Sequence, residues 1–183
     1  MNYITRLRAW HILHSQPWHF NEDQLRSTLA GAAKLAPASS KKPKWEPFTI
    51  NTLECVLEKL DCSKPLDATI TGCTTTIFYS LLCATEFTQK TLNSFNPADH
   101  VKPSDISQKI NQNSLSVTVF TLPKTKCSNE PKDTYQSRQD GISNPEHNLQ
   151  NHLTVNTPPP DGPLLAYKCT KRHRPLIRKV FLD

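Results

Sequence analysis

The sequence predicts a mainly α-helical protein with a small β-sheet, an α+β fold. Apolar residues recur at helical spacing in several segments, whereas period-two alternation is clear only around residues 115–122. A hydrophobic content of 36% in 183 residues is sufficient for a buried core. Composition changes at a proline- and lysine-rich stretch near residue 40, which predicts a boundary between two regions.

Two short helices and a linker are predicted at the start of the chain. Apolar residues keep helical spacing from Ile4 until Pro17, and the pattern resumes after Asn21, a suitable N-cap. The stretch LAPASSKKPKWEPF contains three prolines and three lysines, which favours an extended linker. We therefore expect one region over residues 1–36, a linker over 37–48 and a second region over 49–183.

The second region opens with two predicted helices. Thr49 is a suitable N-cap for a helix that carries Leu53 and Leu57 on its apolar face. Another helix is expected from near Pro65 through LDATITGCTTTIFYSLLCA. The β-branched run at residues 74–77 would equally suit a strand, but the length of the apolar segment favours a helix.

The chain changes character after residue 95. The alternation in SLSVTVFTL predicts a strand that Pro123 ends, and a polar stretch follows from Cys127 to Asn144. A helix is expected from about Pro145 to Val155, before a turn forced by NTPPPDG. The last segment, RPLIRKVFLD, resembles the start of one more helix.

Charge and cysteine content narrow the function classes. The chain has 22 Lys and Arg against 16 Asp and Glu, and a pI near 9.0, which permits a polyanionic partner. Six cysteines without a C-x-x-C pair favour reduced, mostly buried thiols over zinc or disulfide frameworks. We expect no metal, no cofactor and no membrane segment, because no apolar run approaches about 18 residues. An intracellular protein is expected.

Several strings, in their order along the chain, resemble tyrosine recombinases of the phage-integrase type, most closely the recombinase-like proteins of fungal mobile elements. They are RLRAWHILHSQPWH, AAKLAPASSKKPK, EFTQKTLNSFNPADHV, FTLPKTK, NHLTVNTPPPDGPL and RPLIRKVFLD. The resemblance implies that residues 1–36 are the last helices of a core-binding (SAM-like) domain. It further implies that residues 37–48 are a linker, and that 49–183 form a partial catalytic domain without its C-terminal part.

The family chemistry needs an arginine where this chain has a cysteine. In the family, a tyrosine attacks the scissile phosphodiester while two arginines hold the phosphate oxygens. The segment CATE aligns Glu86 with the glutamate of the first arginine motif and Cys83 with the arginine itself. A neutral thiol lacks the charged, bidentate fork of arginine, and losing one such donor costs about 100- to 1000-fold in rate. The alternative is that Cys83 is a small buried apolar residue.

The remaining catalytic positions are vestigial or absent. The strand-borne lysine of the family matches Lys126, and Lys124 is the adjacent candidate. The later histidine-x-x-arginine motif and the nucleophilic tyrosine would lie beyond Asp183. The tyrosines present are interpreted as packing or surface residues: Tyr3, Tyr79, Tyr135 and Tyr167. The resemblance thus predicts a truncated, inactive relative of the family rather than an enzyme.

DNA binding is the part of the family function that we expect to persist. The candidate phosphate-binding residues are Arg6, Arg8, Lys41, Lys42, Lys44, Arg172, Arg174 and Arg178. Binding through them would be weak, sequence-independent and salt-dependent, in a nuclear protein related to DNA integration and recombination. The alternatives are an interaction fragment that pairs with full-length recombinase relatives, or a decayed mobile-element remnant. His11, His14 and His19 are interpreted as exposed or interfacial residues rather than a metal or base-stacking site.

Overall fold

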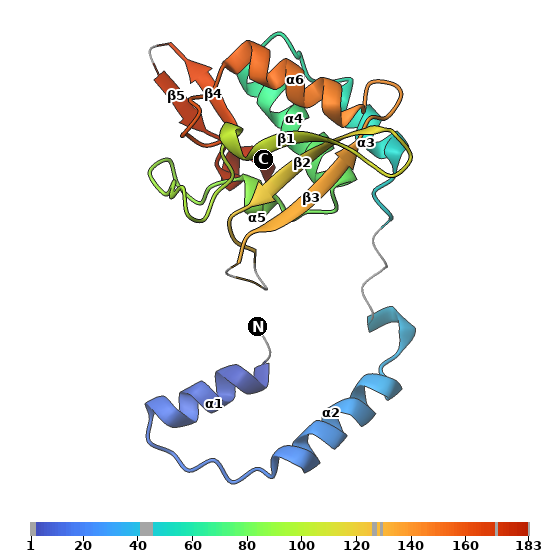
Figure 1. The fold of residues 1–183 in the computed structure, drawn as a ribbon. Helices are drawn as coiled ribbons and strands as arrows, with labels where there is room; N and C mark the ends of the chain where they lie inside the picture. Colours follow the sequence, from blue (N-terminus) through green and yellow to red (C-terminus); the bar gives the residue numbers. More distant parts are fainter. Residues whose placement is uncertain (1–2, 41–45, 126–127, 129, 171, 183) are drawn as a thin grey trace. The chain divides into compact units, whose positions relative to one another are not determined.

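The computed structural model describes residues 3–40, 46–125, 128, 130–170 and 172–182 (Figure 1). Its secondary structure is mainly helical with small antiparallel sheets, which confirms the predicted α+β class. The chain divides into two compact units, Met1–Pro47 and Phe48–Asp183. Within the described residues, no helix has the length and apolar character needed to cross a membrane.

The first unit contains two α-helices that bury none of their described residues. They are α1 (Tyr3–Leu13) and α2 (Glu22–Leu35), followed by the 3-10 turn η1 (Ala38–Ser40). The side chain of Asn21 caps α2, as predicted, by accepting hydrogen bonds from two backbone N–H groups of the first turn. An ion pair of 2.6 Å between Arg8 and Glu22 joins the two helices.

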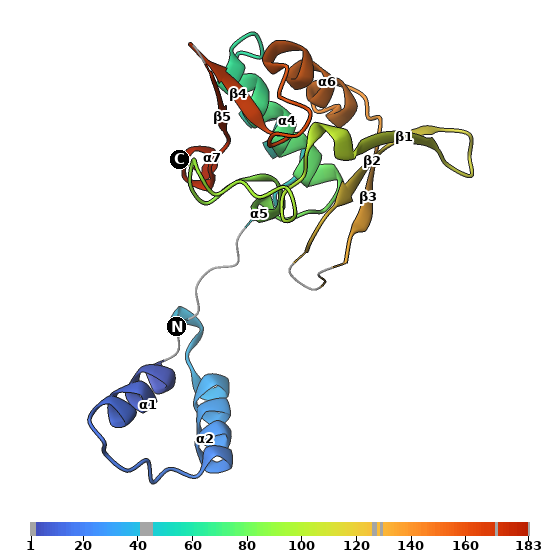
Figure 2. The same ribbon diagram turned by 60° about the vertical axis from the view of Figure 1, so that its left-hand side comes forward.

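The second unit places a pair of helices between two sheets (Figures 1 and 2). Its helices are α3 (Ile50–Leu57), α4 (Pro65–Tyr79), α5 (Ala84–Phe87), α6 (Pro145–Asn156) and α7 (Arg178–Leu182), with a 3-10 turn η2 (Pro103–Asp105). Its strands are β1 (Ile106–Ile110), β2 (Ser116–Leu122), β3 (Lys132–Ser137), β4 (Ala166–Cys169) and β5 (Arg172–Pro175). In both views the β1–β2–β3 sheet and the β4–β5 hairpin lie on opposite sides of the α4–α6 pair.

Helix α4 resolves the ambiguity between helix and strand in favour of the helix. Proline at the first helical position starts it, where a missing N–H is tolerated. Its threonine hydroxyls donate to carbonyls four residues earlier, from Thr69 to Pro65, Thr74 to Ile70 and Thr75 to Thr71. These bonds satisfy the hydroxyls of the buried Thr69 and Thr75 inside the helix, whereas the buried Thr76 hydroxyl has no partner among the described residues.

Helix α6 begins where the sequence predicts and packs closely against α4. The Asn144 side chain accepts from two N–H groups of the first turn, and Pro145 takes the first helical position. The helix ends where Thr157 adopts a left-handed φ of 43°. Close packing depends on Gly72, because a Cβ there would lie 3.2 Å from the Cβ of His152.

The three-stranded sheet has two strands that were not predicted. Strand β2 confirms the expected strand and lies centrally, with β1 and β3 antiparallel on either side. Strand β3 lies within the polar stretch 127–144, where no strand was predicted. Strand β1 contributes only the partly buried Ile106 to the core, and Gln136 is the only buried residue of β3. Strand β3 therefore has no apolar face of its own and is held by ladder hydrogen bonds to β2.

The C-terminal segment combines a hairpin with a short helix. Strands β4 and β5 pair antiparallel, with Tyr167 opposite Arg174 and Cys169 opposite Arg172. The predicted last helix is present but starts at Arg178, because the preceding residues up to Pro175 belong to β5. The backbone of Gln89 bonds to Leu176 and Arg178, so the loop after α5 lies beside this segment.

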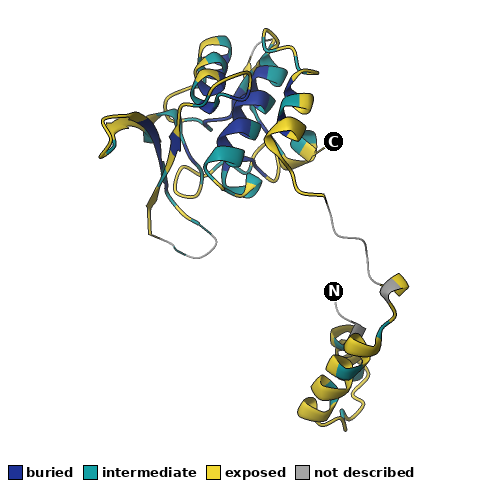
Figure 3. Ribbon diagram, turned by 90° about the vertical axis from the view of Figure 1, so that its right-hand side faces the viewer, coloured by how far each residue is buried: buried dark blue, intermediate teal, exposed yellow. Residues whose placement is uncertain are grey.

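The core of the second unit lies where α4, α6 and the sheet strand β2 meet (Figure 3). Its buried members are Cys73, Phe87, Val101, Phe120, Leu122, Leu149, Leu164, Leu165 and Leu176. Phe87 packs edge-on against Phe120 with ring centroids 5.6 Å apart, which attaches the short helix α5 to β2. The prediction of mostly buried cysteines is wrong for the described ones, because only Cys73 is buried. Burial raises the pKa of the Cys73 thiol.

Candidate functional site

The segment aligned with the first arginine motif forms a tight turn between α4 and α5. Leu81 has a left-handed φ of 52°, and Cys83 is the N-cap residue of α5. The carboxylate of Glu86 accepts a hydrogen bond of 3.0 Å from the backbone N–H of Cys83. Glu86 therefore closes the turn by a backbone contact.

Cys83 lies on the surface of this turn. The reading of Cys83 as a buried apolar residue is wrong, since the residue is exposed. An exposed N-cap side chain at this point can face solvent or a ligand, but a thiol offers only one weak donor. The turn thus presents no strong anion-binding side chain at position 83.

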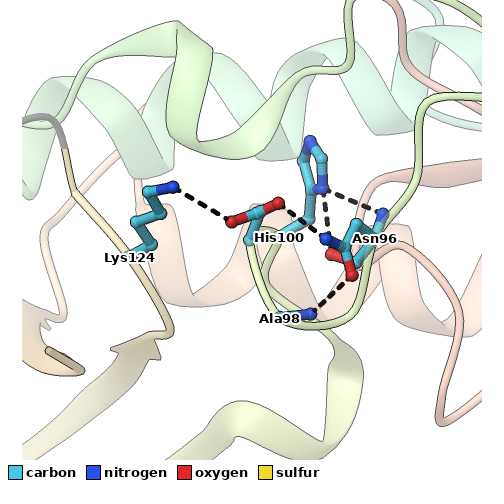
Figure 4. A network of polar contacts seen from close by, with 5 residues as sticks. Asn96, Ala98, His100 and Lys124 are labelled. Atoms are coloured by element: carbon cyan, nitrogen blue, oxygen red, sulfur yellow. Dashed lines mark hydrogen bonds and ion pairs between the residues drawn. The ribbon is translucent and has the colours of Figure 1, made fainter. Parts of the chain in front are cut away.

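The predicted strand-borne lysine cannot be placed, because Lys126 lies outside the described residues, as do Lys41, Lys42 and Lys44. Its neighbour Lys124 follows β2 and forms an ion pair of 3.4 Å with Asp99 (Figure 4). The amide of Asn96 donates to the same carboxylate at 2.7 Å. Lys124 is therefore neutralised by a loop contact that is exposed and contributes only about 0–1 kcal/mol to stability.

The loop around Asp99 is organised by its own polar groups (Figure 4). The Asn96 side chain accepts from the backbone N–H of Ala98, and the His100 ring accepts from the backbone N–H of Asn96 at 3.2 Å. These contacts fix the carboxylate toward Lys124. A phosphate approaching this edge would have to compete with Asp99 for the lysine.

The described tyrosines occupy structural or surface positions. The hydroxyl of Tyr79 lies 3.1 Å from Ser143, which in turn donates to Glu54, so this tyrosine links α4, α3 and the loop before α6. Tyr135 is exposed on the edge strand β3, and Tyr167 is half-buried on β4. The side chain of Tyr3 lies outside the described residues.

The β4–β5 hairpin and α7 carry a basic cluster, defined as Arg172, Arg174, Arg178 and Lys179. Among the described residues, none of the four has a carboxylate within ion-pair distance. Several basic residues elsewhere do have one, as in the pairs Lys64–Asp61 and Lys109–Asp133. Three of the predicted phosphate-binding residues thus lie on the consecutive elements β5 and α7, with positive charge that no described side chain offsets.

The histidine next to these arginines is held by the fold. The Nε2–H of His173 donates a hydrogen bond of 2.7 Å to the backbone carbonyl of Asn156 at the end of α6. Asn93, from the loop after α5, lines the same surface as Arg172 and Arg174. Sequence reasoning did not include Asn93 in the site, since only the tertiary fold brings its loop to the hairpin.

The first unit offers fewer free cations than predicted. Arg6 is exposed without a described partner, but Arg8 is paired with Glu22. His11 contacts the rings of Trp10 and Trp18 at centroid distances of 5.3 and 5.2 Å. The described residues hold no group of three potential metal ligands.

Comparisons with known proteins add no relative: no family model matches this chain, and no curated protein matches it. The resemblance to tyrosine recombinases therefore rests on the six sequence strings and stays a prediction. The geometry contributes a separate observation, the basic cluster on the β4–β5 hairpin and α7.

Proposed function

We propose that this chain binds the phosphate backbone of DNA through the basic cluster of the β4–β5 hairpin and α7. The supporting observation is that these four cations have no described carboxylate partner. Unpaired Arg and Lys side chains release condensed counterions when they contact phosphates, and this drives sequence-independent binding. A nuclear location and a role connected with DNA integration and recombination are part of the proposal.

We further propose that the chain does not cleave DNA strands. Cys83 stands where the resembling family has a phosphate-holding arginine, and its turn offers only a thiol and backbone groups. The nearby carboxylate of Glu86 is used to close the turn, and it would repel a phosphate rather than bind one. A transition state with growing negative charge would be poorly stabilised here.

The test is fluorescence anisotropy of the purified chain with a generic labelled duplex, titrated from low to physiological salt. A footprint of about four phosphates predicts that log K falls with log salt with a slope of about −3.6. The variant Arg172→Gln/Arg178→Gln should lower the slope by about 2. The control Lys59→Gln/Lys132→Gln removes the same charge from two exposed positions, one just after α3 and one at the start of β3. It should change the salt slope little.

Two results would contradict the proposal. One is the absence of duplex binding at low salt. The other is an equal loss of binding in both double variants, which would mean that net charge rather than the basic cluster is responsible. Covalent DNA adduct formation or relaxation of supercoiled plasmid would contradict the inactive assignment alone.

A second candidate function, pairing with recombinase relatives, is favoured by the exposed apolar residues of the first unit. Leu13 is 79% exposed and Leu35 is 87% exposed, at the ends of the two helices. Exposed apolar patches are typical of protein contact surfaces, and Ile12 and Phe20 add further exposed apolar area to this unit. Sedimentation velocity of the chain with a full-length recombinase tests this: Leu13→Glu/Leu35→Glu should abolish a complex without changing duplex binding. A chain that never forms a complex would contradict it.

A further inference from the structure

Two small cavities lie along strand β5, and both are lined by Arg172 and Arg174. The first has a volume of about 310 Å³ and the second about 280 Å³. The first is completed by Leu92, Asn93, His173 and Pro175, and the second by Cys169 and Thr170. Among the described residues, no carboxylate lines either cavity. This donor-rich lining differs from the cavity beside α6, where Arg138 and His147 share the wall with Glu146.

The two arginines are placed to act on one ligand. Arg172 and Arg174 are two residues apart on a strand, so their side chains leave the same face of the hairpin, about 6.6 Å apart along the backbone. Neither has a hydrogen-bond acceptor among the described residues. His173, between them, is anchored through its Nε2–H to Asn156, which steadies the strand at this point.

Arg174 has an unsatisfied hydrogen-bond donor. Its Nε–H is shielded from solvent and has no partner among the described residues. A shielded donor without a partner destabilises the unliganded site, because it has lost its water without gaining an acceptor. Because the Nε–H is shielded, an oxyanion in the cavity would bind the terminal nitrogens of the guanidinium, which form a fork that suits phosphate.

We infer that the Arg172–Arg174 pair forms a discrete pocket for a phosphate monoester or free phosphate, as opposed to a diffuse basic patch. Two guanidinium groups match a group that carries close to two negative charges at neutral pH, more closely than the single charge of a phosphodiester. Asn93 lines the first cavity and Thr170 the second, so each of the two cavities beside the arginines also has a neutral donor. The pocket's use at a phosphorylated DNA end rests on the proposed function, whereas its binding of inorganic phosphate does not.

The first experiment follows the arginine Nε–H signals of the full chain by NMR during titration with inorganic phosphate at constant ionic strength. The Arg174 signal, assigned from the Arg174→Lys variant, should shift and saturate, and dimethyl phosphate should bind at least about tenfold more weakly. Arg174→Lys keeps the charge but loses the fork, so it should weaken phosphate binding about tenfold or more. Arg138→Lys, in the carboxylate-containing cavity, is the matched control and should bind phosphate like the unaltered chain.

The second experiment distinguishes the source of the phosphate group. Anisotropy is compared for one duplex with 5′-phosphate ends and the same duplex with 5′-hydroxyl ends. Preference for the phosphorylated ends, lost in Arg174→Lys, supports the pocket with a DNA end as ligand. Equal affinity for both duplexes with saturable inorganic phosphate binding supports the pocket with a free phosphate group as ligand.

The inference is overturned if the Arg174 signal does not saturate, or if dimethyl phosphate binds as well as inorganic phosphate. Salt-dependent duplex binding that responds to Arg172→Gln/Arg178→Gln would then leave the proposed function standing without the pocket. Saturable phosphate binding by a chain that binds no duplex would give the opposite result, a pocket without DNA binding.

Discussion

Helices α2 and α4 have similar lengths, and each has a glycine in its interior, but they are held in different ways. α4 buries seven residues, four of them threonines, whereas α2 buries none. A Cβ on Gly31 in α2 would meet nothing within 4 Å, while a Cβ on Gly72 in α4 would meet His152 and the Asn148 carbonyl. Helix α2 thus depends on local signals such as its Asn21 cap, and α4 on its tertiary contacts.

The contacts that hold α4 converge on a buried polar centre, defined as Thr69, His152 and Asn156. The Asn156 Nδ2, with two N–H groups to donate, lies 2.9–3.1 Å from the Pro65 carbonyl oxygen, Thr69 Oγ1 and His152 Nδ1. Its side-chain oxygen accepts from the backbone N–H of Lys168 on β4. The opposite ring nitrogen of His152 donates to the Leu164 carbonyl at 2.9 Å. The hydrogen-bonding groups of this centre are satisfied within the protein, unlike the arginines of the hairpin.

The largest effect is expected from Asn156→Ala. The substitution removes the bonds to α4 and leaves the N–H of Lys168 without its acceptor, so the free energy of unfolding should fall by about 2–4 kcal/mol. Urea unfolding followed by circular dichroism measures it. The control Asn113→Ala removes an exposed amide from the β1–β2 turn and should change the free energy of unfolding little. Equal effects of the two substitutions would show that the polar centre does not hold this unit.

The paired substitutions Gly72→Ala and Gly31→Ala test the difference between the two helices directly. Gly72→Ala forces α6 away, because the new methyl group meets the His152 Cβ at 3.2 Å, and should destabilise the second unit by about 1–2 kcal/mol. Gly31→Ala should stabilise helix α2 by up to about 1 kcal/mol and so increase the helicity of the first unit. Both are measured by circular dichroism during denaturation. Stabilisation by both would mean that α4 and α6 are not in close contact.

The contrast between these helices also explains what could be predicted from the sequence. Helices with strong local signals, such as the Asn21 cap of α2 and the Pro65 start of α4, were predicted correctly. Strand β3 was missed because its only buried side chain is Gln136, so its pairing with β2 leaves no apolar pattern to read. The cavity at Arg174 needs Asn93 from a distant loop, and sequence spacing does not show that contact.

The pH dependence of the free energy of unfolding should reflect the protonation of His152. Burial lowers the pKa of this imidazole below its usual value, and the hydrogen bond to the Leu164 carbonyl opposes the shift only in part. The unfolded chain therefore binds the proton more readily, so stability is complete above about pH 6.5 and falls as pH decreases through that value. Urea midpoints from pH 5 to 8 measure it, with a smaller effect expected than for Gly72→Ala. The exposed His147 serves as control, because His147→Gln should leave the dependence of the urea midpoint on pH unchanged.

The smallest effect is expected from Asn21→Ala in the first unit. The Asn21 side chain accepts from the N–H groups of Asp23 and Gln24 at 3.0 and 3.1 Å, and losing this cap costs a helix about 1 kcal/mol. Because α2 buries no side chain that could compensate, the loss should appear as lower helicity of residues 22–35 in NMR chemical shifts. The urea midpoint of the second unit should not move, since its helices are held by their own core. A shifted midpoint would show that the two units unfold together, and that α2 is supported by contacts beyond its own turn.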